Sequence, residues 1–238
     1  MQAMQTESIH IPFDDTAVVV AAYNEETVIA DVLDDLRRPG FQCVVVDDGS
    51  SDRTAEIAAQ HADHVLRHRL NAGQGAALRT GIEYALRSLP GQYVATFDAD
   101  GQHRVEDLKT MVTAIRLGAS DVVLGSRFLA GGEAPGIPRL RRLMLKTAVR
   151  FTRRTTHLDV TDTHNGLRVF TREAASQLRL QEPGMGHATE VLEQCALLHL
   201  KVEEVPTTVQ YTEYSRRKGQ GAINSISLLF DWFLGRMR

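Results

Sequence analysis

The stretch YVATFDADGQHRVEDL, residues 93–108, joins an apolar run to two aspartates, a glycine and the start of a helical pattern. The run YVATF has the continuous apolar character of a strand buried on both faces of a parallel sheet. The helical pattern places four apolar side chains on one face: Val105, Leu108, Val112 and Ile115. Asp98 and Asp100 therefore stand just beyond the carboxyl end of a buried strand, which is where open α/β sheets bind ligands.

Strand-like runs and helical patterns alternate along most of the chain. Further apolar runs stand at 16–22, 43–47 and 121–125, and a late strand is expected around 202–210. Helical patterns cover 28–36, 75–89, 137–155, about 187–200 and 223–238, and an irregular segment precedes the helix around 187. This order predicts an α/β/α sandwich with a mainly parallel central sheet and amphipathic helices toward the C-terminal end.

The composition narrows the class of protein. The chain has 238 residues and a formal net charge of −3, which gives no electrostatic reason to expect nucleic-acid binding. Cys43 and Cys195 stand in apolar runs without metal-ligand spacing and predict core thiols in a reducing compartment. We find no secretory signal, and the apolar stretch SISLLFDWFLG is too short to span a bilayer, so a cytoplasmic chain is expected.

Three strand ends carry related polar sequences: AAYNEE (21–26), VDDGSSDRT (46–54) and FDADGQH (97–103). Because the carboxyl ends of parallel strands meet at one edge of a sheet, these turns predict a single ligand site. Asp98 and Asp100 would repel each other there unless a cation lies between them, and oxygen ligands suit Mg²⁺ or Mn²⁺ bridging to substrate phosphates. An EF-hand is excluded because the glycine falls two places early and Lys109 stands at the closing glutamate position.

Taken together, these motifs resemble family 2 glycosyltransferases, which have the GT-A fold, a Rossmann-like α/β/α sandwich. The resemblance rests on AYNEE, VVVDDGSSDRT, LNAGQGAALRTGI, DADGQH and GSRF, and covers residues 16–129. A looser match, DVTDTHNGLRVF (159–170), resembles the polyprenyl-phosphate (dolichol-phosphate) mannosyl- and glucosyltransferase branch, with Asn165 and Leu167 in place of serine and phenylalanine. We expect an N-terminal extension (1–15), a GT-A domain (16–212), and a basic loop with an apolar helix (213–238). The domain would hold a nucleotide-sugar half (16–129) and an acceptor half (130–212).

The resemblance also implies roles for individual residues. The nucleotide would contact Ala22, Tyr23, Glu25, Asp48, Gly73, Gly75, Asp98 and Ala99, with Asp48 accepting from an N–H of the base. The metal would be held by Asp98, Asp100 and Gln102. Acceptor phosphate would be clamped by Arg127, Arg139, Arg141 and Arg168, and the catalytic set would be Asp100, Arg127 and Arg168. A flexible cationic loop that closes over the diphosphate would contain Arg216, Arg217 and Lys218.

We therefore expect an inverting, metal-dependent glycosyltransferase that moves a sugar from a nucleoside diphosphate to polyprenyl phosphate at the cytoplasmic membrane face. One alternative acceptor is a saccharide hydroxyl of a cell-envelope glycan, for which Asp162, His164 or Glu190 would be the base. Another alternative is a non-catalytic nucleotide-sugar binder. The residues leave open the sugar, the choice among UDP, GDP and dTDP, and the oligomeric state, with a homo-oligomer among the alternatives.

Two stretches predict peripheral contact with a membrane or with a membrane subunit. Residues 137–155 combine seven Arg or Lys side chains with apolar residues at helical spacing, and 223–238 form an apolar pattern that ends in arginines. A basic helix with an apolar face suits the surface of an anionic bilayer, although the same pattern occurs in helices that pack on a core.

Overall fold

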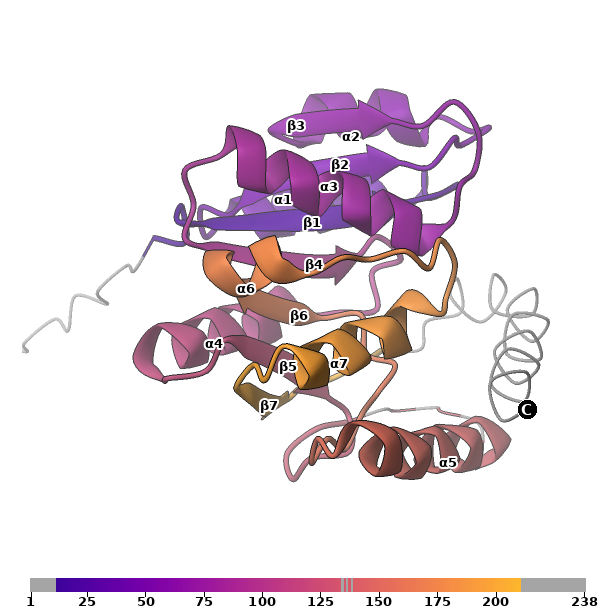
Figure 1. Ribbon diagram of the computed structural model, residues 1–238. Coiled ribbons are helices and arrows are strands. Elements are labelled where there is room, and N and C mark those ends of the chain that lie inside the picture. Colours follow the sequence, from indigo (N-terminus) through magenta and orange to yellow (C-terminus); the bar gives the residue numbers. More distant parts are fainter. Residues whose placement is uncertain (1–11, 134, 136, 138, 211–238) are drawn as a thin grey trace, which may run out of the picture.

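The structure is a computed structural model that describes residues 12–133, 135, 137 and 139–210, without the side chains of 139–142 and 144. A seven-stranded sheet runs through it in the order β3-β2-β1-β4-β6-β5-β7 (Figure 1). The strands are β1 (Thr16–Ala22), β2 (Gln42–Asp47), β3 (His64–Arg67), β4 (Tyr93–Asp98), β5 (Val122–Ser126), β6 (Arg168–Thr171) and β7 (Val202–Pro206). All neighbours are parallel except that β6 runs antiparallel to both β4 and β5.

Helices cover both faces of the sheet. Helices α1 (Ile29–Arg37), α2 (Thr54–His61) and α4 (Val105–Leu117) lie on one face, and α3 (Gln74–Ser88), α6 (Arg172–Gln177) and α7 (His187–Leu197) on the other (Figure 1). Val18 and Val20 of β1 pack in the first apolar cluster, whereas Val19 packs in the second. This alternation of buried residues gives the predicted α/β/α sandwich its two cores.

Three elements of the structure were not predicted from the sequence. β3 is a four-residue edge strand, too short for a clear apolar pattern. β6 and α6 lie in the segment that was expected to be irregular. β6 is also short, and its pairing between β4 and β5 depends on partners far away in the chain, so no local signal marks it. The strand expected around 202–210 ends at Pro206.

Helix α5 (Arg139–Thr156) confirms the predicted basic helix and lies apart from the sheet (Figure 1). None of its described side chains belongs to either apolar cluster. Thr152 and Thr156 are buried, whereas Leu143 is 60% exposed. No helix in the described ranges is both long and apolar enough to cross a bilayer. The expected basic loop and apolar helix at 213–238 lie outside the described residues, so that domain boundary stays a prediction.

Candidate active site

The turns that follow β1 and β2 are tied to each other by hydrogen bonds. The backbone N–H of Asn24 donates to Ser50 Oγ at 2.9 Å, and the N–H of Glu25 donates to Thr54 Oγ1 at 2.8 Å. Glu25 is buried by these contacts, whereas the ring of Tyr23 is 42% exposed. The Asx-rich and Ser-rich turns therefore form one polar rim at the carboxyl edge of the sheet, as the sequence predicts.

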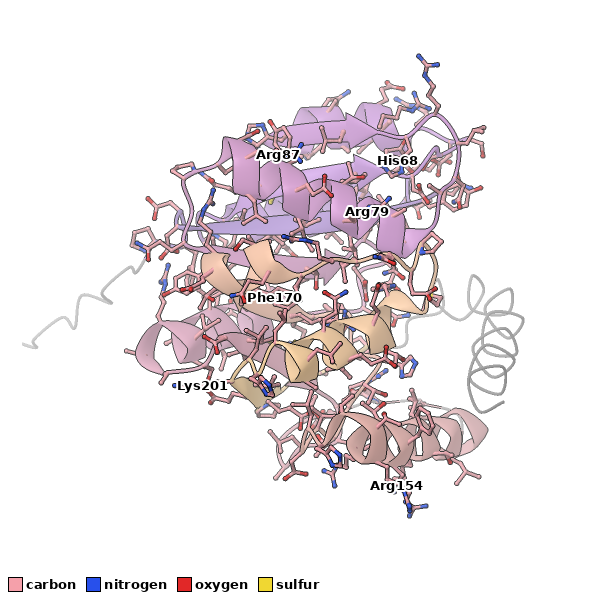
Figure 2. The ribbon with its side chains drawn as sticks, in the orientation of Figure 1. His68, Arg79, Arg87, Arg154, Phe170 and Lys201 are labelled. Carbon is pink, nitrogen blue, oxygen red and sulfur yellow. The ribbon has the colours of Figure 1, made fainter. Side chains whose placement is uncertain are left out.

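Asp48, directly after β2, binds the loop that follows β3. Its Oδ1 accepts from His68 Nδ1 at 2.7 Å and from Ala72 N at 2.9 Å, and its Oδ2 accepts from Gly73 N at 2.7 Å. His68 lies at the end of the sheet toward which β1, β2 and β3 point (Figure 2). Only 4% of the Asp48 side chain is exposed, so this carboxylate fixes the loop against the end of β2.

Asp98, the last residue of β4, is held by groups from three separate segments. Its Oδ1 accepts from Gln74 Nε2 at 2.9 Å, and its Oδ2 lies 3.0 Å from His103 Nε2, which must donate because a carboxylate only accepts. Gly166 lies so close that a Cβ there would come within 2.5 Å of Asp98 Oδ1. Burial works against ionisation, but the hydrogen bond and charge of His103 keep the pKa of Asp98 below its usual range.

Asp100 has the electrostatic properties of a cation ligand. Burial and the negative charge of Asp98 raise the pKa of Asp100 to about 6. Its Oδ1 accepts from the backbone N–H of Gln102 at 3.0 Å. Within the described ranges, no three His, Cys, Asp or Glu side chains gather as a closed metal centre. Two carboxylates with an adjacent amide instead fit Mg²⁺ or Mn²⁺, which keep several waters and share substrate phosphates.

The glycines before and within the first turn of α3 lie against another part of the chain. Gly73 has φ +99°, a conformation that favours glycine. A Cβ on Gly73 would come 2.9 Å from Pro183 C, and one on Gly75 would come 2.9 Å from His187 Cβ. In the structure, residues 183–187 make the close approach that these glycines permit, so contact of this turn with a nucleotide stays a prediction.

Arg127, at the end of β5, forms a buried ion pair with the segment that precedes β6. Its Nε and Nη2 donate to the two oxygens of Asp162 at 2.6 and 2.7 Å. Glu204 of β7 accepts from the backbone N–H groups of Thr161 and Asp162 at 2.8 and 3.0 Å. Burial alone would raise the pKa of Asp162, but the charge and hydrogen bonds of Arg127 hold that pKa below its usual range. The pair anchors the segment 159–167, whose Gly166 lies against Asp98.

Arg168, the first residue of β6, is 3% exposed. Among the described residues, its guanidinium makes one long hydrogen bond, from Nη2 to Ala188 O at 3.5 Å. It forms no salt bridge in the described part of the chain. Burial lowers the pKa of the Arg168 guanidinium, whereas the nearby negative charges of Asp98 and Asp162 act in the opposite direction. Among the described residues, this buried cation lies near the Asp98 carboxylate but forms no ion pair.

The three expected base candidates are all engaged. Asp162 is paired with Arg127, and Glu190 accepts from the backbone N–H groups of Gln181 and Glu182 at 2.8 and 3.1 Å. Burial lowers the pKa of His164 to about 4. The lowered pKa values of Asp162 and His164 do not suit a side chain that must deprotonate a hydroxyl.

Other predicted positions differ in how far the structure describes them. Ala22 and Ala99 are buried at the ends of β1 and β4. Arg139 and Arg141 lie in α5, but their side chains are outside the described residues, as are Arg216, Arg217 and Lys218 entirely. Gln210, the last described residue, donates its N–H to Gln102 O at 2.9 Å, so the chain leaves the described region beside Asp100.

The structure adds four residues to the candidate site: Gln74, His103, Gly166 and His187. The first three stand inside or beside the quoted motifs, so motif position could have marked them. His187 had no such signal, because it stands at the start of an ordinary amphipathic helix. Burial and the charge of Arg168 lower the pKa of His187 to about 4, so its ring is neutral at pH 7.

Comparison with known proteins gives consistent results. Residues 17–179 match glycosyl transferase family 2. An uncharacterized protein of Methanocaldococcus jannaschii is 36% identical over 240 residues, which cover 100% of this chain and 98% of that protein. A dolichyl-phosphate hexose transferase of Haloferax volcanii is 35% identical over 196 residues, which cover 82% of each chain.

Solved structures support the same fold. Glucosyl-3-phosphoglycerate synthase from Mycobacterium tuberculosis, in complex with Mn²⁺ and UDP-glucose, is 22% identical with a TM-score of 0.66, covering 83% of this chain and 71% of that one. At this identity the likeness concerns the fold alone. The chain is therefore a family 2 glycosyltransferase with the GT-A fold, and it resembles the branch of that family that acts on polyprenyl phosphates.

Proposed function

We propose that this enzyme transfers a sugar from a nucleoside diphosphate to polyprenyl phosphate, with inversion and with a divalent metal ion, at the cytoplasmic face of a membrane. The similarity to a dolichyl-phosphate hexose transferase over 82% of each chain supports the acceptor class. The buried cation at Arg168, which pairs with no anion of the residues that the structure describes, is the observation that carries the proposal, because a phosphate monoester would supply one.

The donor is proposed to lie along the rim made by the ends of β1, β2 and β4. The exposed ring of Tyr23 offers a surface on which a base can stack, and Asp48 stands at the end of the adjacent strand. Asp98, Asp100 and Gln102 would hold Mg²⁺ or Mn²⁺. When bound there, the ion neutralises the charge of the departing diphosphate.

The acceptor phosphate is proposed to bind Arg168 through charge-assisted hydrogen bonds. A phosphate monoester is already an anion at neutral pH, so its oxygen can attack the anomeric carbon without a general base. This agrees with the engaged state of Asp162, His164 and Glu190. Arg127 stays a predicted clamp, although two of its nitrogens already bind Asp162.

The test replaces Arg168 by glutamine. We expect the KM for a short-chain polyprenyl phosphate to rise at least about tenfold, because one charged partner of the acceptor is removed. The Kd of the nucleotide should stay within about twofold, and Tm should hold or rise because an uncompensated buried charge is gone. The readouts are sugar transfer to the lipid from a panel of nucleotide sugars, calorimetric nucleotide binding and thermal unfolding.

Arg172→Gln, four residues further along the chain, is the matched control. The Arg172 guanidinium donates to the carbonyl oxygens of Leu86 in the last turn of α3 and of Leu89 and Gly91 just beyond it. Its loss should lower Tm and leave the acceptor KM unchanged. A wild-type acceptor KM in Arg168→Gln would contradict the proposed acceptor site.

A further inference from the structure

The hydrogen bonds of Asp48 limit what a nucleotide base can offer it. An ionised carboxylate has about four acceptor positions, two on each oxygen. Oδ1 already accepts from His68 Nδ1 and Ala72 N, at 2.7 and 2.9 Å, and Oδ2 accepts from Gly73 N at 2.7 Å. Both positions of Oδ1 are therefore filled, and one position remains on Oδ2.

The packing around Asp48 keeps this arrangement in place. The neighbouring Gly49 has φ +73°, and a Cβ there would come 2.8 Å from the carbonyl carbon of Leu70, so the two turns touch through their backbones. His68 is held from its other side, with Nε2 3.0 Å from Thr80 Oγ1 of α3. Rotating the carboxylate to free Oδ1 would break its bonds with His68 Nδ1 and the N–H of Ala72, which hold the loop against the end of β2.

Bases differ in the donors on their Watson–Crick edge. Guanine presents two adjacent donors, N1–H and N2–H, which together match both oxygens of a free carboxylate. Uracil and thymine present a single N3–H between two carbonyl oxygens. The one open position of Asp48 fits a single donor, and the second donor of guanine would meet an oxygen that is already saturated. A site that leaves a polar group unpaired discriminates strongly.

Resting on the proposed function, we propose that Asp48 makes the enzyme favour uridine or thymidine diphosphate sugars over guanosine diphosphate sugars as donors. Specificity arises because His68, Ala72 and Gly73, all in the segment 68–73, use three of the four acceptor positions of this carboxylate. The residue that anchors the loop is thereby also the residue that selects the base.

The first experiment needs no variant. Calorimetric titration of the full chain with UDP, dTDP and GDP, in the presence of MnCl₂, measures the three Kd values. We expect the Kd of GDP to exceed that of UDP at least about tenfold, with dTDP closer to UDP than to GDP. A Kd for GDP equal to or below that of UDP overturns the inference. Failure of all three to bind instead overturns the proposed nucleotide-sugar function.

Asp48→Asn tests whether this carboxylate is responsible. We expect UDP to lose at least about tenfold in affinity and the ratio of GDP to UDP affinity to approach one. Asp63→Asn is the matched control, because Asp63 also accepts from a backbone N–H, that of Cys43 at 2.8 Å, but at the opposite end of β2. It should keep the wild-type ratio. An unchanged preference for UDP in a folded Asp48→Asn protein overturns the assignment to Asp48, and the wild-type titration decides the inference if that variant does not fold.

Discussion

Asp100 is a carboxyl group whose ionisation the folded protein resists. Burial and Asp98 raise its pKa from 3.8 to about 6, so the folded chain binds this proton more tightly than the unfolded chain does. The free energy of unfolding therefore falls as pH rises from 3.8 to about 6, and the cost persists above that range. We expect Asp100→Asn to raise Tm at pH 7 without added metal. The same change should abolish transfer and the increase in Tm that Mn²⁺ gives the wild type.

Asp31→Asn is the control for Asp100→Asn, because Asp31 is an exposed aspartate on α1. Its Tm, its response to Mn²⁺ and its transfer rate should equal those of the wild type. Thermal unfolding across about pH 3 to pH 7 (roughly one unit to either side of the transition), with and without Mn²⁺, measures both effects. Metal-dependent transfer by Asp100→Asn at the wild-type rate would show that this carboxylate does not hold the ion.

At the scale of elements, the segment 159–167 lies against Asp98, and Gly166 is its point of contact. Gly166→Ala should push the Asp98 carboxylate out of place, because a Cβ would come within 2.5 Å of Oδ1. We expect a loss of stability of about 1–3 kcal/mol and a marked loss of nucleotide and Mn²⁺ affinity. Gly184→Ala is the control, since a Cβ there meets nothing within 4 Å, and it should bind like the wild type. Equal nucleotide and Mn²⁺ affinity in the two variants would contradict the role of Gly166 in placing the Asp98 carboxylate.

At the scale of the whole molecule, helix α5 lies apart from the sheet (Figure 1), and none of its described side chains belongs to either apolar cluster. Arg150 and Arg154 are exposed, and Arg154 points away from the body of the protein (Figure 2). Anionic lipid attracts such residues by about 1 kcal/mol each near the surface, and salt screens this attraction. We expect binding to anionic vesicles that weakens as salt rises and that drops when both residues are replaced by glutamate. Flotation measures it, with Arg87→Glu on α3 as the control, and vesicle binding that is equal in all variants would contradict a role for α5.

The sequence by itself determined the periodic parts of this protein. Continuous apolar runs and helical spacing specify β1, β2, β4 and the helices between them, because these patterns are local consequences of strand and helix geometry. The polar turns after those strands also belong to the sequence, since glycine and Asx residues set their conformation nearby. Together they predicted the α/β sandwich, the family and the edge of the sheet that carries the site.

Only the tertiary structure decided which distant residues meet at that edge. Asp162 pairs with Arg127 across 35 positions of sequence, and Gly166 lies against Asp98 because β6 enters the sheet antiparallel beside β4. Arg168 is consequently buried without an ion pair to any described residue, and Asp48 has three of its acceptor positions filled. Burial and hydrogen-bond saturation depend on the three-dimensional neighbours of a group, which spacing along the chain does not encode, so these properties emerged only from the folded chain.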